Sequence, residues 1–139
     1  MTEPEQRQLI LLIDDDFHYL IPVSDALEAA GFRVTWQMHP DDVMEWLNHG
    51  ICPDLILCDL MIFRTAEQPL DEARQEGLVL IRQFRTLFPD CPILALTGVL
   101  DEDILAAASD MLEPQNVILK PADPSYSCKH VRDRLSQAD

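Results

Sequence analysis

The sequence predicts an α/β fold in which helices cover both faces of a doubly wound parallel sheet. Three apolar runs end in charged residues, at positions 11–16, 55–59 and 118–120, and a fourth, at 94–98, ends in the hydroxyl of Thr97. Continuous apolar runs of this length are typical of strands buried on both faces of a parallel sheet. Ligands of such sheets bind beyond the carboxyl ends of the strands, so these polar side chains are predicted to meet in one pocket.

The first predicted unit is a strand at about residues 9–14 followed by a helix. Apolar residues recur at helical spacing from Leu20 to Ala30, and Gly31 suits the position just after the last helical turn. Pro22 removes one backbone hydrogen bond, so the regular helix is expected to begin near it or to bend there.

The second unit begins with residues 32–37, which alternate like a short strand. A helix is predicted over residues 40–48, because Pro40 suits a first helical position and Gly50 suits the end. The third strand is predicted at residues 54–59.

The rest of the chain continues the alternation of helix and strand. Prolines 89 and 92 break the chain before a strand, and acidic residues at 101–103 suit the start of a helix because they complement its dipole. The remaining predicted elements, in chain order, are helix 77–88, strand 93–97, helix 101–112, strand 117–120 and helix 125–136. The pattern is (βα)5.

Length and charge limit the possible functions. The chain has 139 residues, which suit a single domain, with a core expected at about residues 9–135 and an inserted loop at about 64–76. Its formal net charge of −15 opposes direct binding to nucleic acid or to anionic lipid. No stretch approaches the roughly 18 apolar residues of a membrane span, and residues 1–8 lack the pattern of a signal peptide. A cytoplasmic protein without membrane insertion is expected.

The polar residues at the strand ends resemble those of a known family. The acidic pair at 14–15, Asp59, Thr97 and Lys120-Pro121 are similar to the landmarks of the receiver domain of bacterial two-component response regulators, in order, over residues 9–135. The resemblance implies the flavodoxin-like strand order 2-1-3-4-5. It also implies a stand-alone receiver similar to chemotaxis regulators, or one excised from a longer protein.

The same resemblance implies a magnesium site. Asp15 and Asp59 would bind Mg²⁺ directly, Asp14 would act through a metal-bound water, and the main-chain carbonyl of Met61 would be a further ligand. The chemistry is consistent, because neighbouring carboxylates repel one another unless a hard divalent cation with oxygen ligands neutralises them.

The resemblance further implies that Asp59 accepts a phosphoryl group from a phosphohistidine. Lys120 would pair with the acceptor carboxylate and then with the phosphoryl oxygens, and the Thr97 hydroxyl would hydrogen-bond them. The implied partners are a sensor histidine kinase or phosphotransfer protein and a downstream protein. The chain would be a signalling domain that catalyses its own phosphorylation and dephosphorylation, not a conventional enzyme.

Two positions and one segment depart from the family pattern. Receivers usually carry a proline four residues past the acceptor, where this chain has Phe63, and the segment 64–76 is longer than usual. That segment is interpreted either as a solvated loop with a short helix after Pro69 or as a determinant of kinase choice. Val117 stands where receivers commonly place an aromatic residue.

Two other functions remain open on the sequence. A phosphatase of the haloacid dehalogenase class also uses a strand-end Asp-x-Asp, as at 14–16, with a later Thr97 and Lys120, but it leaves Asp59 unexplained. A pseudo-receiver would keep the fold and bind a partner without phosphorylation. Asp16 itself is assigned to the helix cap.

Overall fold

The computed structural model describes residues 7–65, 67–98, 106–108, 112, 116–120 and 123–137. Of the helix predicted at 101–112, only residues 106–108 and 112 are described, and 106–108 are helical. The rest of that prediction, and Pro121, lie outside the described residues.

The described strands form one parallel sheet with the order β2-β1-β3-β4-β5. This is the predicted strand order. Every residue of β1, β3 and β4 is buried, as expected for inner strands covered on both faces. The strands are β1 (Leu9–Ile13), β2 (Arg33–Gln37), β3 (Leu55–Asp59), β4 (Ile93–Thr97) and β5 (Val117–Leu119).

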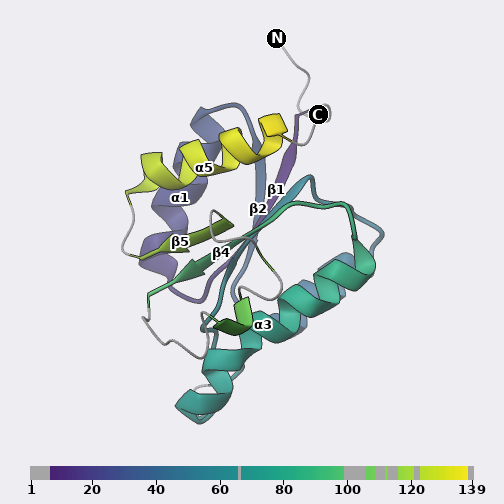
Figure 1. Ribbon diagram of the computed structural model, residues 1–139, viewed down its shortest axis with the longest axis vertical. Coiled ribbons are helices and arrows are strands. Elements are labelled where there is room, and N and C mark those ends of the chain that lie inside the picture. Colours follow the sequence, from purple (N-terminus) through teal and green to yellow (C-terminus); the bar gives the residue numbers. More distant parts are fainter. Residues whose placement is uncertain are drawn as a thin grey trace.

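Helices cover both faces of the sheet, as Figure 1 shows. The helices are α1 (Phe17–Ala29), α2 (Pro40–Leu47), α3 (Leu70–Leu87) and α5 (Pro124–Gln137). Helices α1 and α5 pack on one face, where Leu20 and Val131 join the core, and α2 and α3 pack on the other, with Val43 and Phe84. None of the helices in these described segments is long and apolar enough to cross a membrane.

Helix α1 begins directly after Asp16, which caps it as the sequence predicts, and does not begin near Pro22. The Asp16 carboxylate accepts hydrogen bonds from the backbone N–H groups of His18 at 3.1 Å and Tyr19 at 3.3 Å. The helix includes Pro22 and is followed by Gly31, whose φ of +100° suits glycine. The cap therefore fixes where the chain leaves β1 and turns into the helix.

Helix α3 differs from its prediction. It begins at Leu70, not Gly77, so the short helix expected after Pro69 and the helix expected from Gly77 are one. Its first turns are mostly exposed and polar, with acidic residues that complement the helix dipole, and this composition resembled a loop. Residues 70–76 of the predicted loop 64–76 therefore belong to the helix.

Candidate functional site

Polar side chains gather at the carboxyl edge of the sheet because the strands are parallel and in register. Asp14 follows β1, Asp59 ends β3, Thr97 ends β4 and Lys120 follows β5. Asp14, Asp59 and Thr97 are all nearly fully buried, with exposed fractions of 0%, 4% and 3%. The backbone carbonyl of Thr97 accepts a hydrogen bond from the N–H of Lys120 at 2.8 Å, which joins the ends of β4 and β5.

Lys120 is shared between two buried carboxylates. Its Nζ lies 2.9 Å from Oδ2 of Asp59 and 2.7 Å from Oδ2 of Asp14. Both contacts are ion pairs, and the contact with Asp59 is also a hydrogen bond. Two negative groups and one positive group leave this part of the site negative.

Asp15 completes a group of three carboxylates. Asp14, Asp15 and Asp59 each offer an oxygen, and the three oxygens lie within 4.8 Å of one another. A backbone N–H group holds each carboxylate: Asp14 Oδ1 accepts from Asp16 at 2.8 Å, Asp15 Oδ2 from Phe63 at 3.0 Å and Asp59 Oδ1 from Met61 at 3.0 Å. This set of oxygen donors, whose negative charges one lysine does not balance, fits a hard divalent cation.

The charges at the site change the proton affinity of its groups. Burial, and next the charge of Asp14, raise the pKa of Asp59 to about 7, although Lys120 and the Met61 N–H, 3.0 Å from Oδ1, oppose the rise. Burial alone would lower the pKa of Lys120, but Asp59 and Asp14 outweigh it and raise that pKa. Lys120 therefore stays a cation, while metal-free Asp59 keeps its proton to a higher pH than an ordinary aspartate.

Comparison with known families fits this geometry. The family model of the response regulator receiver domain matches residues 10–132 of the sequence, a stretch that contains all four strand ends described above. This chain belongs to the response regulator receiver family. Receivers are signalling domains that bind Mg²⁺ at an acidic pocket, and this chain has an acidic cluster of Asp14, Asp15 and Asp59.

One curated relative is the phosphoglycerate transport system transcriptional regulatory protein PgtA of Salmonella typhimurium. It is 29% identical over 133 residues, which cover 92% of this receiver. The receiver spans only 28% of the length of that relative.

Solved structures show the same fold. A CheY-like receiver domain protein from Methanospirillum hungatei has a TM-score of 0.78 at 19% identity, with 96% of this chain and 97% of that chain covered. A response regulator from Thermotoga maritima has a TM-score of 0.75 at 25% identity, covering 94% and 98%. One from Burkholderia pseudomallei, with a phosphorylated aspartic acid, a calcium ion and citrate, has a TM-score of 0.71 at 24% identity, covering 94% and 69%.

In this receiver, Gly77 lets α3 approach the end of β3. A Cβ at this position would lie 2.6 Å from the carbonyl oxygen of Leu60 and closer still to that of Asp59. The Gly77 N–H also donates to Leu60 O at 3.2 Å. The sequence assigned Gly77 only to the start of a helix, because a close approach between separate elements leaves no local signal.

Tyr19 is a second residue of the site that sequence reasoning missed. Its ring centroid lies 4.5 Å from Nζ of Lys120. Tyr19 also lines a pocket of about 350 Å³ together with Asp59, Met61 and Lys120. The contact joins the first turn of α1 to the residue after β5. Because these residues are far apart in the sequence, no local pattern indicates the contact.

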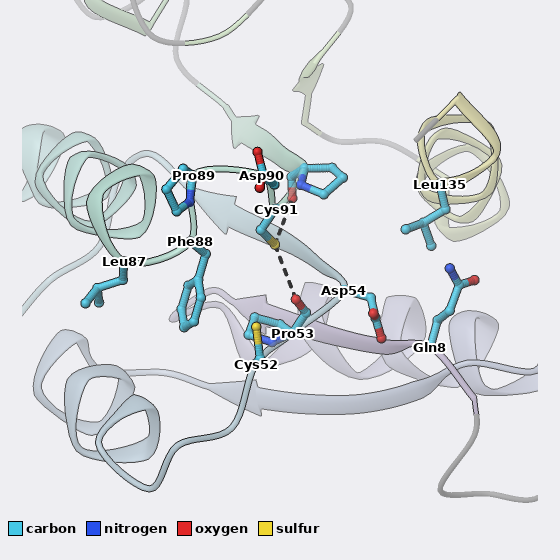
Figure 2. A pocket seen from close by; sticks show the side chains of 11 residues that line it. Gln8, Cys52, Pro53, Asp54, Leu87, Phe88, Pro89, Asp90, Cys91 and Leu135 are labelled. Atoms are coloured by element: carbon cyan, nitrogen blue, oxygen red, sulfur yellow. Dashed lines mark hydrogen bonds between the residues drawn. The ribbon is translucent and has the colours of Figure 1, made fainter. Parts of the chain in front are cut away.

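A second pocket lies at the opposite edge of the sheet, near the starts of β1, β3 and β4 (Figure 2). Its volume is about 500 Å³. Cys91, which lines it, donates from Sγ to the carbonyl oxygen of Pro53 at 3.4 Å, and burial is the main reason that its pKa rises to about 12. The thiol is therefore unreactive at neutral pH, and the acidic cluster lies at the other edge of the sheet.

Proposed function

We propose that this receiver accepts a phosphoryl group on Asp59 from the phosphohistidine of a sensor histidine kinase or phosphotransfer protein. The observation that carries the proposal is the placement of Lys120 Nζ, 2.9 Å from Asp59 Oδ2 and next to a group of three carboxylates. The Burkholderia relative, whose aspartic acid is phosphorylated, supports the same chemistry.

Asp14, Asp15 and Asp59 are the side chains that would hold Mg²⁺, together with the main-chain carbonyl of Met61. When bound, the ion neutralises the negative charge that gathers on the phosphoryl oxygens. The backbone N–H groups of Asp16 and Phe63 orient two of these carboxylates before any ion arrives. Such orientation lowers the cost of arranging the site for the reaction.

In the transfer, an oxygen of Asp59 forms a bond to phosphorus while the phosphorus–nitrogen bond of the phosphohistidine breaks. The imidazole of the donor leaves with the electron pair of that bond. Lys120 stays protonated, so it can move its hydrogen bond from the carboxylate to a phosphoryl oxygen and stabilise the charge there. The Thr97 hydroxyl, at the end of the neighbouring strand, would donate a second hydrogen bond.

The phosphorylated protein would then change its contact with a downstream protein. The negative charge of the chain, −15, makes a direct nucleic-acid target unfavourable for the receiver by itself. We therefore expect the signal to pass through protein contacts.

The test is phosphorylation by a small phosphodonor in the presence of Mg²⁺. Intact mass is expected to increase by one phosphoryl group in the wild type and to stay unchanged in Asp59→Asn or after chelation of the metal. A matched control is Asp54→Asn, which changes an exposed aspartate at the opposite edge of the sheet.

Two results would contradict the proposal. Modification that persists in Asp59→Asn would place the acceptor elsewhere. No modification by either a small donor or a kinase, together with partner binding that Asp59→Ala leaves unchanged, would identify a pseudo-receiver. Turnover of a chromogenic phosphate ester would support the phosphatase alternative.

A further inference from the structure

Tyr19 lies beside the ammonium group of Lys120, which must move during the proposed reaction. Nζ lies 4.5 Å from the centroid of the Tyr19 ring, and Asp14 and Asp59 are the other two partners of the ammonium group. The face of an aromatic ring is electronegative and attracts a cation. Three groups therefore restrain a side chain that would otherwise rotate about its flexible stem.

The Tyr19 ring is itself held by α5. Its hydroxyl lies 3.1 Å from Oγ of Ser127, and Ser127 is fully buried. Burial is the main reason that the pKa of Tyr19 is raised, so the hydroxyl keeps its proton at neutral pH. Helices α1 and α5 lie together on one face of the sheet (Figure 1), and this hydrogen bond joins them next to the site.

We propose that Tyr19 is a positioning residue for Lys120, and that its hydrogen bond to Ser127 transmits the position of Lys120 to α5. The inference rests on the proposed phosphorylation of Asp59. When Lys120 moves from the carboxylate to a phosphoryl oxygen, its contact with the ring changes, and the ring is tied to α5. Receivers commonly place an aromatic residue at the position of Val117 on β5, and this domain has no ring there. The hydrogen bond from Tyr19 to Ser127 would therefore connect the site to a helix surface by another route.

The first test separates the ring from the hydroxyl. Tyr19→Leu removes both, Tyr19→Phe keeps the ring, and Ser127→Ala removes only the partner of the hydroxyl. Tyr126→Leu is the matched control, because Tyr126 is a half-exposed tyrosine on α5 that packs against His130. The readouts are the maximal rate of small-donor phosphorylation and, separately, the affinity for Mg²⁺.

Tyr19→Leu is expected to lower the maximal rate roughly fivefold to tenfold, with the Mg²⁺ affinity changed less than about twofold. Tyr19→Phe and Ser127→Ala are expected to keep most of the rate. In these two variants, beryllium trifluoride should cause much smaller amide chemical-shift changes in α5 than in the wild type. A rate in Tyr19→Leu within about twofold of the wild type would overturn the positioning role. Shift changes in α5 on adding beryllium trifluoride that are as large in Tyr19→Phe and Ser127→Ala as in the wild type would overturn the transmission.

The juxtaposition can also be tested without phosphorylation. Protons of the Lys120 side chain near the ring face should show upfield ring-current shifts in the wild type and in Tyr19→Phe, and should lose them in Tyr19→Leu. Ordinary shifts in the wild type would overturn the inference while leaving the proposed function intact. If wild-type Asp59 is not phosphorylated although the upfield shifts are present, the proposed function fails and the positioning contact stands. If Tyr19→Leu does not fold, Tyr19→Phe and Ser127→Ala still decide the transmission.

Discussion

Position 77 shows at the scale of one residue how closely α3 packs against the end of β3. Gly77→Ala is expected to reduce the free energy of unfolding by about 2–3 kcal/mol, because the new Cβ would collide with the backbone of Asp59 and Leu60. Denaturant titration measures the loss. Gly31→Ala is a suitable comparison. The positive φ at this position strains alanine by about 1 kcal/mol, but no atom lies within 4 Å of the new Cβ. Equal losses in the two variants would contradict the steric role of Gly77.

The raised pKa of Asp59 predicts that the stability of the metal-free protein depends on pH. Its pKa of about 7 in the fold exceeds the value of about 3.9 for an unfolded aspartate, so the native state holds the proton more tightly. The wild type therefore loses stability as the pH rises from about 4 to about 7, and this contribution stays lost above that range. Asn at this position does not titrate.

In chelator at about pH 8, Asp59→Asn is expected to be more stable than the wild type by about 4 kcal/mol, and the difference should shrink toward about pH 4. Thermal or denaturant unfolding across this range measures it. Asp25→Asn, at an exposed position of α1, controls for the removal of one negative charge. A difference that grows as the pH falls would have the wrong sign for this account.

At the scale of elements, the segment between β3 and α3 is held by polar contacts. The Arg64 guanidinium pairs with Glu76 at 3.1 Å and with Asp41 of α2, and the Arg64 N–H donates to Gln68 Oε1 at 2.7 Å. Gln68 in turn donates to Glu76 at 2.9 Å. The same segment carries the Phe63 N–H that binds Asp15, so its order affects the acidic cluster.

Arg64→Ala is expected to increase the hydrogen exchange of the first turns of α3 while lowering the global stability by less than about 1 kcal/mol, because partly exposed ion pairs contribute little. Hydrogen-exchange mass spectrometry measures the local effect. Arg82→Ala, at an exposed position later in α3, is the control. Unchanged protection of residues 70–76 in Arg64→Ala would show that helix packing alone holds this segment.

At the scale of the whole molecule, the fold followed from the sequence because its signals are local. The apolar runs of β1, β3 and β4 are continuous, and parallel strands necessarily bring Asp14, Asp59 and Lys120 to one edge. The predicted start of α3 was wrong because the first turns of this helix are polar and exposed, which is also typical of a loop. The approach at Gly77 and the contact of Tyr19 with Lys120 join distant parts of the chain, so spacing along the sequence could not predict them.

The net charge of −15 and the three clustered carboxylates make the stability of the whole domain depend on cations. Mg²⁺ bound only by the native state stabilises by about 1.4 kcal/mol at ten times its dissociation constant, which corresponds to a rise in Tm of roughly 3–5 °C for a chain of this size. Calorimetry with Mg²⁺, against NaCl at the same ionic strength, separates binding from general screening of the charge. Asp15→Asn removes one proposed ligand and is expected to lose most of the specific rise while keeping the response to NaCl. An equal response of both proteins to Mg²⁺ would mean that the ion acts only by screening, and the acidic cluster would then have no specific metal.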